Sequence, residues 1–387
     1  MKRLLNGLLH SSVAWIVFLP LFAYAQPSAA PSSAQSQQGK TSAQSPHAPA
    51  IKRQIPRAEA VTASSDGRIH LDVIVTDEKG MPVRGLTTKD FTVLDNGKPM
   101  PVLSFHAYNA VMNQPPPPVS FAIVFDTVNI QFRHIAYIRQ QVSSFLRQNG
   151  GHLTYPVSLL YLTDTGVKVL AQPSYDGNAL AATLDKADSR LRDITLRAGD
   201  YGQDDRYQIS LELFLAVVHD LERVPGRKML VWLGPGWPML TSPEWDQPSA
   251  KDQRSLFNLI VSLSARMRED QVAVDSVAYG EPDAHTYFYQ NYLKGLRSPY
   301  QATADNLALK VLATQSGGLI VFPTNDVTGG IDSCIQDANS YYSISFQPPH
   351  ARRPNEYHAL KLKVDKPKVT VRTNTGYYDD PQTVSAP

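Results

Sequence analysis

The spacing of apolar residues changes along the chain and divides it into segments. From residue 69 to 77 every second residue is apolar, which is the spacing of a strand with one buried face. Strand patterns recur at 91–94 and 101–108, and the sequence Asp95-Asn96-Gly97 between them predicts a hairpin, because its turn needs positive φ. Residues 66–110 therefore predict a small antiparallel β module.

From residue 118 onward, apolar strands alternate with amphipathic helices. Six short segments are almost continuously apolar, as in a sheet covered on both faces: 119–126, 156–163, 167–172, 228–234, 272–280 and 318–323. Apolar residues at three- and four-residue spacing predict helices at 133–149, 178–192, 207–224, 252–269, 303–315 and 327–339. This alternation predicts a doubly wound, mostly parallel sheet in a domain that covers residues 118–340.

One pair of strands departs from the parallel pattern. Only Asp164, Thr165 and Gly166 and their neighbours separate the strand at 156–163 from the strand at 167–172. A parallel crossover needs a dozen or more residues, so these two strands should form an antiparallel hairpin. The predicted fold class is therefore Rossmann-like α/β with one antiparallel edge strand.

Residues 341–380 return to the two-residue spacing of strands. They could extend the central sheet or fold back onto the N-terminal β module. We expect the second arrangement, because two incomplete β segments that flank one α/β domain can complete each other. The result would be a small β-sandwich-like module built from both ends of the chain.

The N-terminus has the features of an export signal. Lys2 and Arg3 precede an apolar run at 13–22, and Ala23-Tyr24-Ala25 offers small residues for cleavage. We interpret residues 1–25 as a Sec signal peptide, which would send the protein to the periplasm or out of the cell. An uncleaved anchor is the alternative, but the apolar run is shorter than the about 20 residues that span a bilayer. No membrane span is expected after cleavage.

Composition narrows the possible functions. Residues 26–65 are rich in Pro, Ser, Ala and Gln and predict a disordered linker. A net charge of +2 gives no basic footprint for nucleic acid. The single cysteine, Cys334, excludes an internal disulfide, and we expect it to be a buried thiol. The loop at 234–239 (GPGWPM) lacks the third glycine of a dinucleotide loop, so no nucleotide is expected.

The strand order, the antiparallel third strand and an aspartate that ends the first strand, Asp126, together resemble a von Willebrand factor type A (VWA) domain. Over residues 68–378 the chain more narrowly resembles the acidobacterial VWFA-related family of exported proteins. Its most specific matching segments are residues 71–105 and 340–378, with FAIVFDTVN at 121–129 between them. The resemblance implies a VWA domain with small β extensions, which binds other proteins and has no known enzymatic activity.

The resemblance also implies a place for Mg²⁺, held by a DxSxS motif, a distant Thr and a distant Asp. Asp126 matches the first Asp, but Val128 and Ile130 stand where the two serines would be and carry no oxygen. Gly234 follows the strand where the distant Asp is expected, and residues 199–210 contain no Thr. We therefore predict a degenerate site without Mg²⁺ or another cofactor, with Asp126 as the only weak metal candidate.

Four residues at this sheet edge are candidates for contact with a partner: Asp126, Thr127, Asn129 and Trp237. For Asp126 we first expect a structural role, accepting backbone N–H bonds at the start of the next helix. Trp237 and the aromatic segment 287–300 are either exposed anchors or a buried lid.

The sequence as a whole predicts a non-enzymatic, adhesion-type module that binds an unidentified protein. The alternatives are an unrecognised hydrolase, or a structural envelope component, that uses the same sheet edge.

Overall fold

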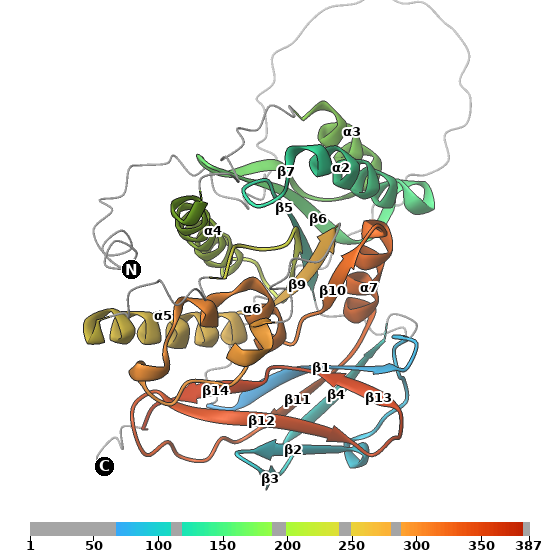
Figure 1. Cartoon of the computed structure of the whole chain (residues 1–387). Helices are drawn as coiled ribbons and strands as arrows, with labels where there is room; N and C mark the ends of the chain where they lie inside the picture. The colour runs from blue at the N-terminus through green and yellow to red at the C-terminus, as the bar shows by residue number, and fades with distance from the viewer. Residues whose placement is uncertain (1–66, 110–117, 188–198, 240–248, 280–287, 382–387) are drawn as a thin grey trace, which may run out of the picture.

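The computed structural model describes five stretches of the chain: residues 67–109, 118–187, 199–239, 249–279 and 288–381 (Figure 1). The expected signal peptide (1–25) and linker (26–65) lie outside the described residues. Two structural layers are visible in Figure 1, an α/β part above and a β-sandwich below.

The α/β part is built on a six-stranded sheet with the order β10-β9-β8-β5-β6-β7. Neighbouring strands are parallel except β6 and β7, which pair antiparallel at one edge. This arrangement confirms the predicted mostly parallel sheet and its antiparallel edge strand. The strands are β5 (Val119–Asp126), β6 (His152–Thr163), β7 (Gly166–Asp176), β8 (Arg227–Leu233), β9 (Val272–Tyr279) and β10 (Ile320–Thr324).

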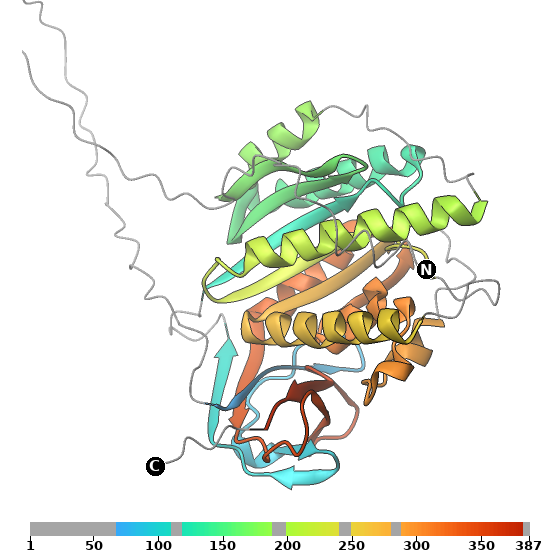
Figure 2. The same cartoon turned by 90° about the vertical axis from the view of Figure 1, so that its left-hand side faces the viewer.

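Three helices cover each face of the sheet. On one face, α2 (Phe132–Leu146), α3 (Gly177–Lys186) and α7 (Val327–Asn339) share a core with inward residues such as Ile123 and Phe125. On the other face, α4 (Gly199–Leu221), α5 (Ala250–Glu269) and α6 (Leu309–Gln315) pack on Ala122 and Val124. Helices α4 and α5 run side by side across this second face (Figure 2). Alternate side chains of one strand thus serve opposite cores, which explains the continuous apolar runs.

One predicted helix is shorter than expected. Residues 303–315 form a short 3₁₀ turn, η5 (Ala304–Leu307), and then α6, with Ala308 extended between them. The Ala304 carbonyl accepts from the Tyr207 hydroxyl at 2.7 Å, and the Leu307 carbonyl accepts from the Trp237 indole at 3.1 Å. These outside donors take carbonyl oxygens that a continuous helix would pair internally.

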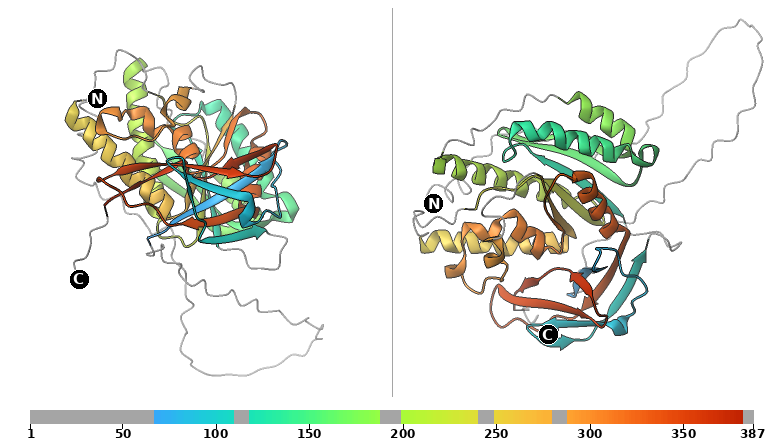
Figure 3. Two further views of the ribbon diagram at one scale, coloured as in Figure 1. Left: turned by 90° about the horizontal axis from the view of Figure 1, so that it is seen from below. Right: turned by 45° about the vertical axis from the view of Figure 1, so that its right-hand side comes forward.

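The β-sandwich contains two four-stranded sheets, β13-β1-β11-β4 and β14-β12-β2-β3 (Figure 3). Each sheet combines strands from both ends of the chain, because β11 pairs with β1 and β4, and β12 pairs with β2. The prediction that the C-terminal strands fold back onto the N-terminal module is confirmed. The strands are β1 (Ile69–Asp77), β2 (Phe91–Asp95), β3 (Lys98–Met100), β4 (Ser104–Asn109), β11 (Ser340–Phe346), β12 (Glu356–Val364), β13 (Val369–Arg372) and β14 (Gly376–Asp379).

Candidate functional site

Asp126 is the last residue of β5 and is fully buried. Its Oδ2 accepts a hydrogen bond from the indole Nε1 of Trp232 at 3.0 Å. Its Oδ1 accepts from the backbone N–H of Asn129 at 3.0 Å, and the Asn129 amide Nδ2 lies 3.0 Å from both carboxyl oxygens. The carboxyl group is therefore surrounded by N–H donors from its own loop and from the neighbouring strand β8.

Burial and hydrogen bonding have opposite effects on the pKa of Asp126. Burial raises the pKa of the Asp126 carboxyl, and donation from Trp232 and Asn129 lowers it. The raising effect is the larger one, because a charged carboxylate is expensive away from water. Asp126 accepts a backbone N–H bond, as expected, but the donor, Asn129, lies in the loop before α2 and not at the helix start, where Gln131 is the N-cap.

Thr127 and Asn129 attach this loop to the elements on either side. The buried Thr127 hydroxyl donates to the backbone carbonyl of Leu162 in β6. The Asn129 Nδ2 donates to the hydroxyl of Ser210 in α4 at 2.8 Å. The loop is thereby fixed to a strand and to a helix, and Ser210 lies in the region where the resemblance placed a distant Thr.

Trp237 is buried, with 4% of its surface exposed, so the buried alternative holds for this residue. Its ring lies edge-on to Trp232, with centroids 5.5 Å apart, and also contacts Phe214. The chain can fold back here because Gly236 has φ +80° and passes so close to Leu309 that a Cβ would lie 2.8 Å from it. The loop therefore seals the sheet edge.

The aromatic segment 287–300 divides between the two expectations. Tyr289 is buried as a lid residue would be, while Phe288 is 47% and Tyr300 is 78% exposed. Tyr287 lies outside the described residues.

The residues at Asp126 do not fit a divalent cation. A cation needs oxygen ligands, but the groups that face the carboxyl are the N–H donors of Trp232 and Asn129. Val128 and Ile130 are buried alkyl side chains in the apolar cores. At Gly234 a Cβ would lie 2.9 Å from the Asp126 Cβ, so no carboxylate can replace it without displacing the loop. Within the described part of the chain, no three His, Cys, Asp or Glu side chains are grouped for a metal.

The buried guanidinium group of Arg206 lies near the Asp126 carboxyl. Arg206 is one helical turn before Ser210 on α4 and is 7% exposed. Burial lowers the pKa of the Arg206 guanidinium and the charge of Asp126 raises it. Its Nη1 has no hydrogen-bond partner among the described residues. Sequence reasoning missed Arg206, Ser210 and Trp232; the usable signal was the tryptophan within the otherwise aliphatic strand at 228–233.

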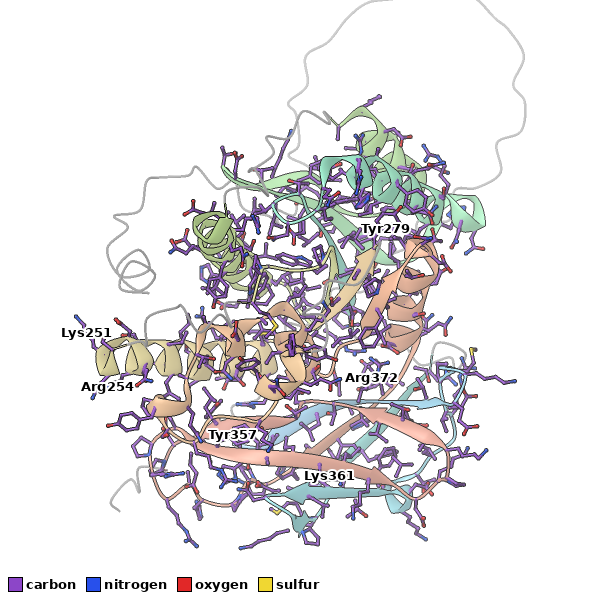
Figure 4. The ribbon with its side chains drawn as sticks, in the orientation of Figure 1. Lys251, Arg254, Tyr279, Tyr357, Lys361 and Arg372 are labelled. Carbon is purple, nitrogen blue, oxygen red and sulfur yellow. The ribbon has the colours of Figure 1, made fainter. Side chains whose placement is uncertain are left out.

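A partly exposed aromatic cluster lies at the same carboxyl edge of the sheet, beside α2. The rings of Tyr137 and Tyr279 stack with centroids 4.8 Å apart, and His134 meets Tyr279 edge-on at 5.2 Å. Figure 4 shows Tyr279 at the side of the α/β part away from the β-sandwich. The exposed Arg133 donates from Nε to the His134 ring at 3.2 Å. We call Arg133, His134, Tyr137 and Tyr279 the edge cluster.

A second buried polar group lies inside the β-sandwich and was also missed. The His358 Nδ1 lies 3.0 Å from Asp95 Oδ1, and the Tyr377 hydroxyl donates to Asp95 Oδ2. The His358 ring stacks on Tyr377 at 4.7 Å, and all three residues are buried. This group joins β2 to β12 and β14 inside the sandwich, which suits a structural role.

The amino-acid sequence matches no protein-family model and no curated protein. Similar solved structures include the human COPII-coat protein Sec24c, with TM-score 0.32, 11% identity, and coverage of 70% of this chain and 44% of that chain. The VWA domain of SpRpn10 gives TM-score 0.27 and 14% identity over 61% of this chain and 100% of that chain. Proximal thread matrix protein 1 from the mussel byssus gives 0.32 and 11%, over 69% and 50%.

The chain thus spans less than half of the length of Sec24c. TM-scores this low are too weak to assign a function. Within the described residues, no helix combines the length and apolar character needed to cross a bilayer.

Proposed function

We propose that the chain is an exported, non-enzymatic protein-interaction module with a VWA-like domain that works without a metal ion. The observation that carries this proposal is the donor shell of Asp126. The position that would hold a cation is instead closed by Trp232 and Asn129, which donate to a fully buried carboxyl. In this proposal the former metal site has become part of the core.

The proposal includes membership of the acidobacterial VWFA-related family and export by the N-terminal signal. Supporting it are the sequence segments at 71–105 and 340–378, whose strands pair to build one sandwich. N-terminal sequencing of the mature protein should begin at Gln26. A mature protein that begins at Met1 would contradict export by cleavage.

The edge cluster is the contact surface that we propose for the partner. Tyrosine and arginine are enriched at interface hot spots, because they combine apolar area with hydrogen bonding. Arg133 is exposed, and the rings of His134, Tyr137 and Tyr279 are half-buried, so a partner could cover them without opening the core. The buried residues Asp126, Thr127 and Trp237 would then support this surface rather than touch the partner.

Cross-linking in the native host tests this proposal. Wild type should capture a defined partner both with EDTA and with added Mg²⁺, and Tyr279→Ala should lose most of it. Arg254→Ala on α5 and Lys361→Ala on β12 are matched surface controls far from the edge cluster (Figure 4). Capture that needs Mg²⁺, or that falls equally in all three variants, would contradict the proposal.

The enzyme alternative is tested separately. A hydrolase screen should find no turnover that is present in wild type and absent in a folded Asp126→Asn variant. Turnover that is lost in the folded Asp126→Asn variant would show that substrate reaches this carboxyl. That result would contradict the closed site proposed here.

A further inference from the structure

A partly buried ionic network joins the β-sandwich to the α/β part, at the end of the sheet opposite Asp126. Arg372 of β13 donates from Nη2 to both carboxylate oxygens of Asp337 in α7, at 2.7 Å each. Arg227, at the start of β8, lies 3.2 Å from Asp72 of β1 and donates to the Asp337 backbone carbonyl at 3.2 Å. Figure 4 shows Arg372 between the two parts of the molecule. Two ion pairs therefore cross this contact.

Asp275 of β9 adds a third carboxyl to this network. It is fully buried and faces α7, since its neighbours Ala273 and Val277 share a core with Ile331 and Cys334. Its Oδ1 accepts from the backbone N–H of Leu319 at 2.7 Å. Its Oδ2 has no hydrogen-bond partner among the described residues, and no cation there lies within ion-pair distance of it.

The charges of the network do not balance when every group is ionised. Two guanidinium groups, those of Arg227 and Arg372, face three carboxylates, those of Asp72, Asp337 and Asp275. Arg227 and Arg372 are already paired with Asp72 and Asp337. An ionised Asp275 would therefore be a buried and uncompensated charge, which is strongly unfavourable.

The groups that face Asp275 come from three elements: Asp337 and Cys334 from α7, Arg372 from β13, and Arg227 from β8. The paired strand β10 has no ionisable side chain, and α5 and α6 pack on the opposite face of β9. Burial and then Asp337 raise the pKa of Asp275 to about 7, against lowering by the Leu319 N–H and the two arginines.

We propose that Asp275 is a pH-sensitive latch between the β-sandwich and the α/β part. With Asp275 protonated, Arg372 is held by Asp337 alone and β13 stays fixed to α7. Loss of the proton places a second carboxylate beside Asp337, which competes for Arg372 and favours opening of the contact.

The direction of the effect follows from where the proton is held. Asp275 has a higher pKa in the closed contact than the ordinary 3.8 it recovers when solvated. At pH values below the ordinary pKa, the bound proton therefore favours the closed state fully. This advantage is lost as the pH rises through about 7. The opening equilibrium should rise roughly tenfold per pH unit from pH 5 and level off above about pH 7.

The single cysteine provides the measurement. Cys334 is fully buried between α7 and the central sheet, and burial and the nearby Asp275 raise the pKa of its thiol, so a reagent reaches it only after an opening that separates α7 from the sheet and exposes Asp275 as well. The full chain is labelled with dithiodipyridine at each pH, and the rate is divided by the rate for the same chain unfolded in urea. Because thiol ionisation affects both rates, it cancels in this ratio, which therefore reports the opening equilibrium alone.

In wild type the ratio of labelling rates should rise roughly tenfold per pH unit from pH 5 and level off above about pH 7. In Asp275→Asn the ratio should not change with pH. Asp365→Asn, which changes an exposed carboxyl in the turn between β12 and β13, is the matched control and should keep the wild-type slope. Amide exchange of residues 369–372 in wild type, with each rate divided by the intrinsic exchange rate at the same pH, needs no variant and should show the same pH dependence. A pH-independent ratio in wild type, or an unchanged slope in folded Asp275→Asn, would overturn the latch.

Discussion

The indole N–H of Trp232 lies 3.0 Å from Oδ2 of Asp126, and both side chains are completely buried. A strand-end aspartate, which in a metal-dependent site would face a cation, here faces a donor from the adjacent strand. The carboxyl is thus held by donors that belong to the chain itself. The sheet edge is consequently a packed element of the fold.

Trp232→Phe should weaken the fold through this one contact. The substitution keeps an aromatic ring but leaves Asp126 with one donor fewer, and a buried acceptor left short of donors costs about 2 kcal/mol. Urea denaturation measures the loss. Trp237→Phe is the matched control: its indole donates to a neutral backbone carbonyl, and its loss should be smaller, about 1 kcal/mol. A larger loss in the control would mean that ring packing, not the Asp126 bond, dominates.

Gly234→Ala should be strongly destabilising and should disturb the same edge. Gly234 has φ +149°, and an added Cβ would lie 2.9 Å from the Asp126 Cβ. We expect a loss of about 2 kcal/mol or more, because both the backbone and the contact are unfavourable for alanine. Gly166→Ala, at φ +136° but with nothing near its added Cβ, separates the backbone effect from the contact. Equal losses at both positions would argue against close approach at Asp126.

Tyr377→Phe should destabilise the β-sandwich without affecting the carboxyl edge. It removes the hydroxyl that donates to the buried Asp95, and leaving that carboxyl short of a donor costs about 1–3 kcal/mol. Amide exchange measured during denaturation should show that the loss of stability lies in β2, β12 and β14. Tyr357→Phe, which removes a bond to the Thr375 carbonyl, is the control in the same strand region. Unchanged stability in Tyr377→Phe would show that Asp95 finds another donor.

Stability should fall as pH rises from about 5 to about 7. Burial raises the pKa of Asp275 to about 7, so the folded state binds a proton there that the unfolded chain has released. The free energy of unfolding should fall by up to about 1.4 kcal/mol per pH unit from this group. Denaturation of wild type and Asp275→Asn at several pH values measures the effect: the two stabilities should be closest at low pH, and the neutral variant should gain on wild type as the pH rises toward about 7. Parallel curves would rule out Asp275 as the source.

Most of the architecture could be predicted from sequence, because burial on both faces leaves a strong pattern. The apolar runs of β5 and β8 and the short turn between β6 and β7 specified the sheet and its antiparallel edge. The return of the C-terminal strands to the N-terminal β module was also predicted, but the specific pairing of β1 with β11 was not.

The site was less accessible to sequence reasoning, because its contacts come from distant residues. That Val128 and Ile130 carry no oxygen was visible in the sequence, but the donor Trp232 belongs to another strand. Trp237 is the type of residue that often anchors an interface. Only the close approach of Gly236 to Leu309 shows that the loop folds inward. The helix break at Ala308 depends likewise on donors from Tyr207 and Trp237.

Restoring the two serine oxygens should not create a metal site. In Val128→Ser/Ile130→Ser, the Asp126 carboxyl still faces the donors of Trp232 and Asn129, and Gly234 still supplies no ligand. Calorimetry with Mg²⁺ should show no binding, while the double variant loses stability because both side chains are buried in apolar cores. Stoichiometric Mg²⁺ binding by the variant would show that the serines alone were missing.

The most direct measurement follows the Trp232 indole N–H resonance during titration with Mn²⁺. The resonance is assigned by its disappearance in Trp232→Phe, and the Trp237 indole serves as the internal reference. A closed, metal-free site predicts that stoichiometric Mn²⁺ leaves the Trp232 signal unbroadened. Selective loss of that signal, reversed by an excess of Mg²⁺, would contradict the account.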